Sequence, residues 1–233
     1  MPRCFASVPP EAPLLVIDAQ SHDATVALAR ARGARVVVRP WAGFVATRAF
    51  GLGCVQTPWT FMLDADESLD SELAGALGDV EAPASVDAYR VKRLTYFSDR
   101  PMRHGAWGDE APVRLFRTER AALVAQPAAG GTAELHERWV VPGGVATLAG
   151  TLAHDSYPTV GAYRAKFARY TSLEARGVRP SREKLVRELA LATLRAPWLL
   201  VGRGAWRDGW RGTYVALASA WYPVVVAWKA LRP

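Results

Sequence analysis

The chain has 233 residues, half of them hydrophobic and 22% charged, which is enough for one good core and excludes a disordered protein or two large domains. Its formal net charge of +7 comes almost entirely from arginine and suits an anionic membrane surface, a phosphorylated substrate or nucleic acid. Cys4 and Cys54 form no motif, and Met1 leads into no apolar run of signal-peptide length. We therefore expect free thiols in a reducing, cytoplasmic setting.

The first half of the chain alternates short apolar runs with helical patterns. This alternation predicts an α/β fold, with parallel strands joined by right-handed crossovers in a layered sheet. Two predicted strands end on an acid, Asp18 and Asp64, and ligands bind at the carboxyl ends of such strands, so we expect both acids at one edge. The predicted elements are a strand at 14–17, a helix from Ser21 to about Arg32, a strand at 35–38, a helix at about 44–56 and a strand at 59–63.

The second half has a different pattern. Residues 89–94 and 113–117 alternate polar with apolar side chains, as half-exposed strands do, and an aromatic loop that contains glycine lies between them at 96–109. From Val160 the pattern is helical to the end, with breaks at Pro180 and Pro197.

The C-terminal region is rich in tryptophan and arginine. The apolar stretch from Tyr214 to Trp228 is short for a membrane span and contains Pro223. Aromatic and basic residues together suit an interfacial helix on anionic lipid, and a helical pair packed on the core is the alternative. The tryptophans of this region are Trp198, Trp206, Trp210, Trp221 and Trp228.

The strongest chemical signal is the sequence Asp64-Ala65-Asp66-Glu67, which follows the predicted strand at 59–63. Two carboxylates spaced by one residue lie on the same side of an extended backbone, and hard oxygen ligands suit Mg²⁺ or Mn²⁺. Such a cation would bridge to a diphosphate and neutralise the charge that develops on it as a leaving group. Acidic loops after strands are common, so this motif alone is a weak signal.

Several segments in a fixed order make the signal more specific. With them the chain resembles family 2 glycosyltransferases of the GT-A fold, in particular the bacterial lipopolysaccharide-core β-glucosyltransferase-like branch. The matching segments are 16–25 (VIDAQSHDAT), 41–44 (WAGF), 59–67 (WTFMLDADE), 114–117 (RLFR), 135–137 (LHE), 152–157 (LAHDSY) and 207–212 (RDGWRG). They cover nearly the whole chain.

The resemblance implies a GT-A-like catalytic domain over residues 1–156 and a helical region over 157–233. It implies that Asp18 contacts the base or ribose of a nucleotide-diphosphate sugar, for which a UDP-sugar is the expected donor. Asp64 and Asp66 would hold the metal and the diphosphate, His154 would complete the metal site, and Arg48 would lie near the nucleotide.

The resemblance places the catalytic base at Glu137. A base that deprotonates an acceptor hydroxyl supports direct displacement at the anomeric carbon, which inverts the configuration. The expected reaction moves a hexose to a lipopolysaccharide-type or lipid-linked glycan. We expect it at the inner face of the plasma membrane, with no nucleic-acid partner.

Each residue has a plainer interpretation. Asp18 could cap the next helix, His154 could be structural, and Glu137 could form a solvated pair with His136. Glu67 points away from its neighbours in a strand-like register and could form only a salt bridge. His104 and Trp107, in the loop at 96–109, could stack on a sugar or simply pack.

The chain also departs from the family pattern. The family's opening strand and its Asn-Glu turn have no counterpart before Cys4, so we expect either a misplaced start codon, a fragment, or a remnant whose nucleotide pocket is open on one side. The family's Asp-Gly-Thr turn is here Asp23-Ala24-Thr25, and a customary asparagine is Ala49. Two other functions stay open. One is a non-catalytic relative that binds a glycan or protein. The other is a basic nucleic-acid binder, against which the basic residues are spread along the chain and not clustered beside exposed aromatic residues.

Overall fold

The computed structural model describes residues 1–80, 82–125 and 137–232. Two compact units are present, and each is described by itself. Unit 1 consists of the described residues within 1–93, 111–126 and 136–154, and unit 2 of those within 94–110 and 155–233. The domain boundary after residue 156 stays a prediction, and unit 2 also includes the loop at 96–109.

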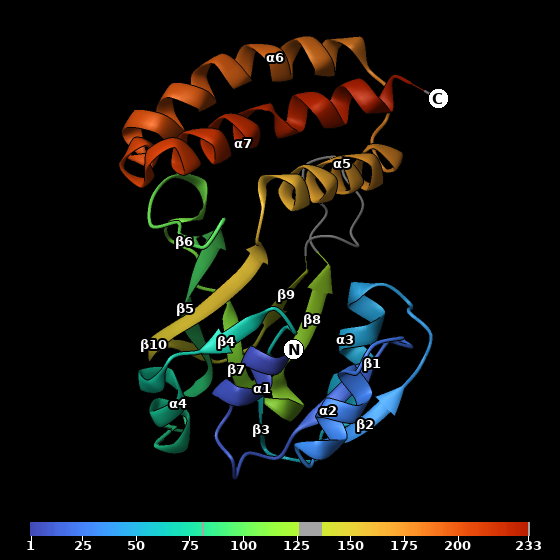
Figure 1. Cartoon of the computed structure of the whole chain (residues 1–233), viewed down its shortest axis with the longest axis vertical. Coiled ribbons are helices and arrows are strands. Elements are labelled where there is room, and N and C mark those ends of the chain that lie inside the picture. Colours follow the sequence, from blue (N-terminus) through green and yellow to red (C-terminus); the bar gives the residue numbers. More distant parts are fainter. Residues whose placement is uncertain (81, 126–136, 233) are drawn as a thin grey trace. The chain divides into compact units, whose positions relative to one another are not determined.

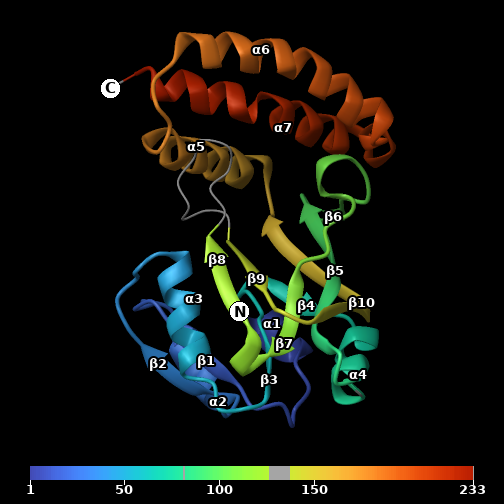
Figure 2. The same cartoon turned by 180° about the vertical axis from the view of Figure 1, so that it is seen from behind.

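Unit 1 begins with short alternating elements, as the sequence predicts. Strands β1 and β2 pair in parallel, with Leu15 opposite Arg35, and the helices α2 and α3 lie beside them (Figures 1 and 2). The elements are α1 (Pro2–Ser7), β1 (Leu15–Asp18), α2 (Thr25–Ala31), β2 (Arg35–Val38), α3 (Phe44–Gly53) and β3 (Trp59–Phe61).

The start of α2 differs from the prediction. Its N-cap is Ala24, not Ser21, because the Ser21 N–H donates to the Asp18 carboxylate at 2.9 Å and the chain between them forms a turn. Asp23 instead accepts the N–H of Thr25 at 3.0 Å.

The larger sheet has the strand order β3-β7-β5-β10-β4, and β6 pairs with β5. Strand β3 pairs antiparallel with β7, so the prediction of one sheet containing both β1 and β3 is wrong. The added elements are β4 (Glu67–Leu69), α4 (Ser71–Gly78), β5 (Val86–Phe97), β6 (Arg100–Pro101), β7 (Val113–Arg117), η2 (Thr118–Arg120), β8 (Ala122–Ala125), β9 (Glu137–Val140) and β10 (Gly144–Tyr157).

The core of unit 1 lies against this sheet and includes Leu73 of α4, which is fully buried. Helix α4 begins where the Asp70 carboxylate accepts the Leu73 N–H at 2.8 Å, a standard N-cap. The cap therefore fixes the chain directly after β4, next to the predicted acidic motif.

Unit 2 is mainly helical. Helices α6 and α7 pack side by side, and α5 packs on α7 (Figure 1). An aromatic cluster around Phe97 and Tyr163 forms part of its core. Although α7 is 22 residues long, no helix among the described residues is long and apolar enough to span a membrane. The elements are η1 (Gly105–Trp107), α5 (Val160–Arg176), α6 (Arg182–Pro197), η3 (Trp198–Gly202), η4 (Ala205–Asp208) and α7 (Gly209–Ala230).

Candidate active site

The acidic motif forms the turn between β3 and β4, in unit 1. Helix α1 holds this turn in place, because the Cys4 thiol lies 3.7 Å from the Asp64 carbonyl oxygen and the Ser7 hydroxyl accepts the Leu69 N–H at 3.0 Å. Burial, opposed by the N-terminal charge, raises the pKa of the Cys4 thiol to about 11. Cys4 is therefore a neutral structural residue, and both cysteines are free, as the sequence predicts.

Asp64 is held by two arginines. Its Oδ1 accepts from Arg48 at 2.6 Å, and its Oδ2 accepts from Arg114 at 2.9 Å. Burial by itself would raise the pKa of Asp64, but the charges and hydrogen bonds of Arg114 and Arg48 outweigh it and hold the pKa below its usual value. Asp64 is therefore an ionised carboxylate that organises two cations.

Glu67 is almost fully buried and forms hydrogen bonds and ion pairs within the turn between β3 and β4. Its Oε2 accepts the Asp64 N–H at 3.0 Å, and its Oε1 lies 2.5 Å from Arg114 and 3.5 Å from Arg93. Glu67 forms the salt bridge of its plainer interpretation, but the prediction that it points away from its neighbours is wrong, because it also accepts the Asp64 N–H and shares Arg114 with Asp64. Because a buried carboxylate needs partners, Arg114 and Arg93 are required for this turn to form.

Glu137 lies at the start of β9 and meets Arg48 of α3, which forms an ion pair with its Oε1. Arg48 therefore joins Asp64 and Glu137 through one guanidinium group. The Glu137 side chain is 8% exposed, and its Oε2 is buried without a hydrogen-bond partner among the described residues. An unpartnered buried carboxylate oxygen is the atom that could accept a proton from a bound hydroxyl group.

The second acid of the motif has a different partner. Asp66 Oδ2 lies 3.3 Å from His154 Nε2, and His154 stands opposite Glu67 in the pairing of β4 with β10. The Asp66 side chain is 43% exposed, so it remains accessible from solvent.

A carboxylate and an imidazole side by side fit Mn²⁺, or Mg²⁺ through the carboxylate. No group of three or more histidine, cysteine, aspartate or glutamate side chains suited to a metal ion occurs in the described part of the chain. Asp66 and His154 could therefore supply two ligands, with a bound diphosphate and water supplying others. Asp64, predicted as a third ligand, is held by its two arginines.

Asp18 lies in the smaller sheet, apart from the motif in strand pairing. Its carboxylate is buried and accepts the Ser21 N–H. It holds the turn before α2, which is close to the alternative interpretation of a capping residue. Its contact with a nucleotide stays a prediction.

Arg114 is the main residue of the site that sequence reasoning missed. It lies in the matching segment at 114–117, whose alternating pattern predicts a strand but gives the arginine no role. An arginine among the apolar residues of a predicted strand is a signal for a buried acid partner, and here the partners are Asp64 and Glu67. His136, predicted as a possible partner of Glu137, lies outside the described residues.

The amino-acid sequence was compared with known proteins. Residues 4–127, more than half of the chain, match the model of Glycosyl transferase family 2. Lipopolysaccharide core biosynthesis glycosyltransferase LpsC of Rhizobium meliloti is 28% identical over 239 residues, which cover 97% of this chain and 85% of that protein.

Uncharacterized glycosyltransferases of Rickettsia are similar over a shorter region. Those of Rickettsia conorii and Rickettsia bellii are each 37% identical over 84 residues, which cover 35% of this chain. The matched region is less than a third of the length of these two relatives, at 30% and 29%. The family match and the arrangement of acids and arginines agree, and this chain belongs to glycosyl transferase family 2.

Proposed function

We propose that the chain is an inverting hexosyltransferase that uses a nucleotide-diphosphate sugar, with a UDP-sugar as the expected donor. The observation that carries the proposal is the bridge by which Arg48 joins Asp64 to Glu137. The bridge brings a buried carboxylate with one unpartnered oxygen beside the acidic turn that follows β3. A base and a diphosphate-handling turn are the two parts that sugar transfer by direct displacement requires.

The donor diphosphate would bind beside Asp66 and His154, which are also the residues that would hold Mg²⁺ or Mn²⁺. A bound cation would offset the negative charge of the departing diphosphate. Arg48 and Arg114 would contribute positive charge near the same groups, and Asp64 would keep both arginines in position. Asp18 is proposed to contact the nucleoside, from the turn before α2.

Glu137 Oε2 would take the proton of an acceptor hydroxyl as that oxygen attacks the anomeric carbon. The bond from the anomeric carbon to the diphosphate oxygen breaks with its electron pair, and the nucleoside diphosphate leaves. Glu137 then returns its proton to solvent. One displacement inverts the configuration, so an α-linked donor would give a β-linked product.

The acceptor is proposed to be a lipopolysaccharide-type or lipid-linked glycan, because LpsC is a lipopolysaccharide core biosynthesis glycosyltransferase and is similar over nearly the whole chain. Exposed tryptophans in unit 2 support peripheral binding at the inner face of the plasma membrane. These side chains are 40–62% exposed and belong to Trp198, Trp206, Trp210, Trp221 and Trp228. Cosedimentation with anionic vesicles tests this, and equal recovery without vesicles would contradict it.

The function is tested by release of UDP from a panel of UDP-hexoses, with Mn²⁺ titrated and a lipopolysaccharide-core acceptor present. We expect Glu137→Gln to lower the rate by about 10²–10⁴-fold, because it removes the base, and to keep UDP affinity, because the glutamine amide oxygen can still accept from Arg48. Glu119→Gln, a charge-matched change in η2, is the control. A Glu137→Gln enzyme as active as the wild type would refute the assignment of the base.

Metal binding is tested separately by measuring Mn²⁺ affinity in the presence of UDP. Asp66→Ala and His154→Ala should each weaken it, and Glu119→Ala should not. An unchanged affinity in both variants would show that these residues do not hold the metal.

A second candidate function is a non-catalytic relative that binds a glycan or protein. The ion pairs of both Asp64 oxygens favour it, since they occupy an acid that was expected to bind metal. No transfer with any donor, together with retained glycan binding, would support this second function.

A further inference from the structure

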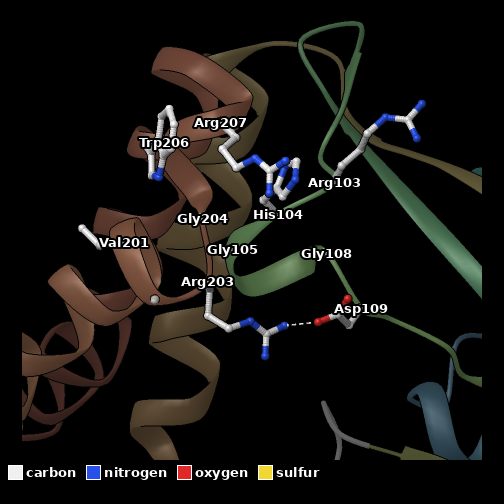
Figure 3. Close-up of a pocket in the computed structure, with 11 residues that line it drawn as sticks. Arg103, His104, Gly105, Gly108, Asp109, Val201, Arg203, Gly204, Trp206 and Arg207 are labelled. Carbon is white, nitrogen blue, oxygen red and sulfur yellow. Dashed lines mark hydrogen bonds and ion pairs between the residues drawn. The ribbon is translucent and has the colours of Figure 1, made fainter.

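Unit 2 contains a pocket of about 460 Å³ that lies apart from the acidic motif in sequence (Figure 3). The loop around η1 and the segment from η3 to η4 line it. Pockets of this size hold small molecules such as a substituted monosaccharide. The charged, imidazole and indole side chains that line it belong to Arg103, His104, Asp109, Arg203, Trp206 and Arg207.

The pocket is held together by close backbone contacts. Gly105 has a φ of +73°, and a Cβ there would lie 2.8 Å from the Cβ of Ala205. A Cβ at Gly212 would lie 1.9 Å from the Ala205 carbonyl oxygen. Both positions therefore require glycine, which explains part of the segment at 207–212 that resembles the family.

The Asp208 carboxylate joins the loop around η1 to the segment from η3 to η4 through hydrogen bonds. Its Oδ2 accepts the backbone N–H groups of Arg103 at 2.9 Å and His104 at 2.8 Å. Its Oδ1 lies 2.8 Å from Nδ1 of His104. With Nδ1 donating to Asp208, Nε2 faces a ligand as an acceptor in the neutral ring and as a donor in the imidazolium, the form that the Asp208 carboxylate and a bound anion both stabilise. The lining is thus preorganised before any ligand binds.

The lining carries an excess of positive charge. Three arginines and one acid, Asp109, line the pocket, an excess of two positive charges. Arg203 pairs with Asp109 at 2.5 Å. Among residues 1–80, 82–125 and 137–232, no acidic side chain pairs with Arg103 or Arg207, and both are exposed. An anion in the pocket would supply the missing partner.

The Arg207 and His104 side chains both approach Gly204, where a Cβ would lie 3.2 Å from Arg207 Cδ and 3.8 Å from His104 Cδ2. In Figure 3 the Arg207 side chain extends toward His104, while Arg103 extends away from both. A guanidinium group near an imidazolium matches a tetrahedral oxyanion, which offers several acceptor oxygens. Trp206 lines the same pocket and is 62% exposed, which leaves an aromatic surface for the apolar face of a sugar ring.

We propose that this pocket binds a phosphorylated sugar, with the phosphate at Arg207 and His104 and the sugar ring against Trp206. Binding of a phosphorylated sugar in this pocket would not require the reaction proposed for unit 1. Its use in recognising a phosphate-bearing acceptor rests on the proposed function. The phosphate could be carried by a soluble sugar or by a glycolipid headgroup, and the chemistry recognised is the same.

The test is an NMR titration of the full chain with glucose 6-phosphate, without donor or metal. Glucose and inorganic phosphate are the two comparison ligands. We expect glucose 6-phosphate to bind at least tenfold more tightly than either, because only it offers both charge and ring. Equal affinity for inorganic phosphate would overturn the sugar part of the proposal, and no binding of glucose 6-phosphate would overturn all of it.

Variants locate the site. Arg207→Ala should weaken glucose 6-phosphate binding about tenfold, Arg207→Lys less, and Trp206→Ala should reduce the preference over inorganic phosphate. Arg182→Ala, which removes an exposed arginine of α6 outside the pocket, is the matched control. Circular dichroism checks that each variant is folded. Equal weakening by Arg182→Ala would attribute binding to net charge and refute the site.

A vesicle arm separates the two sources of phosphate. Glucose 6-phosphate should compete with vesicles that carry a phosphorylated glycolipid if the headgroup uses this pocket. Vesicle binding that depends on Arg207 but is insensitive to glucose 6-phosphate would overturn the proposal in favour of a general lipid contact. UDP release is measured on the same variants, so loss of transfer and loss of sugar-phosphate binding remain distinguishable.

Discussion

Arginine has different roles at the acidic turn of unit 1 and at the pocket of unit 2, although Arg203 of the pocket pairs with Asp109. In unit 1, Arg48 and Arg114 are paired with carboxylates, and Arg114 contacts two of them. In the pocket of unit 2, Arg103 and Arg207 have no acidic partner among the described residues. A buried arginine is tolerated only with acids around it, whereas an exposed arginine at a pocket can remain available for a ligand. An acidic partner therefore distinguishes Arg48 and Arg114, which hold the acidic turn, from Arg207, which is proposed to bind a ligand.

The acids follow the same division. Glu67 and Asp64 hold the turn after β3 through their arginines. Asp208 holds the loop of unit 2 through backbone N–H groups and His104, which leaves the positive charge of Arg207 uncompensated. At the acidic turn of unit 1 the acids neutralise cations, whereas Asp208 positions the loop that lines the pocket of unit 2.

The largest expected effect is that of Arg114→Met. The substitution leaves the buried Glu67 without its nearest cation and should lower the free energy of unfolding by about 3–5 kcal/mol. Arg90→Met, which removes an exposed arginine from β5, should change it by less than about 0.5 kcal/mol. Urea denaturation at pH 7 measures both. Similar values for the two would show that Arg114 is not the counter-ion of the turn.

The double variant Arg114→Met with Glu67→Leu refines this result. Removing the buried acid together with its cation should recover part of the stability, because no unpaired charge remains. A double variant less stable than Arg114→Met would instead indicate that Glu67 stabilises the turn mainly through the Asp64 N–H.

Asp208→Ala should have a smaller effect. It removes the acceptor for two backbone N–H groups and His104, so we expect a loss of about 1–2 kcal/mol in unfolding free energy. Asp109→Ala, which removes only the exposed partner of Arg203, should cost less than about 0.5 kcal/mol. Thermal and urea unfolding give the comparison. Equal losses would mean that Asp208 does not fasten the loop.

Acidification should weaken unit 1 through Asp64. Its folded pKa lies below the unfolded value, so its contribution is fully present above about pH 4, the usual aspartate pKa. This contribution is lost as the pH falls through the folded pKa, because the protonated acid no longer attracts Arg114 and Arg48. The excess stability of the wild type over Asp64→Asn should therefore shrink as the pH falls from about 4 to about 2. A constant difference over that range would contradict the sign.

Sequence reasoning predicted the parts of the site that depend on local pattern. An apolar run that ends on an acid predicts Asp64 directly after a strand, and a salt bridge of Glu67 is one of the two interpretations of that residue. The GT-A fold expected from the resemblance is confirmed by membership in the family. These features follow from the spacing of apolar residues or from ordered motifs, both of which are visible in one sequence.

Contacts between distant segments could not be predicted in the same way. Alternation marks 113–117 as a strand, but it does not say that β3 pairs with β7, and this pairing places Arg114 at the acidic turn. The bridge from Arg48 to Glu137 joins α3 to β9 and depends on tertiary packing. Likewise, no local pattern links His104 to Asp208, which lies 104 positions away.

The smallest expected effect is that of Arg207→Ala on the unliganded chain. An exposed arginine without an acidic partner contributes little to folding, so unfolding free energy should change by less than about 0.5 kcal/mol. With glucose 6-phosphate at ten times its Kd, the wild type should gain about 1.4 kcal/mol by mass action, and the variant much less. Urea denaturation with and without the ligand measures both. An arginine that binds an anion should stabilise the fold only when the anion is bound. A loss of unfolding free energy above about 1 kcal/mol without ligand would therefore make Arg207 a structural residue like Arg114.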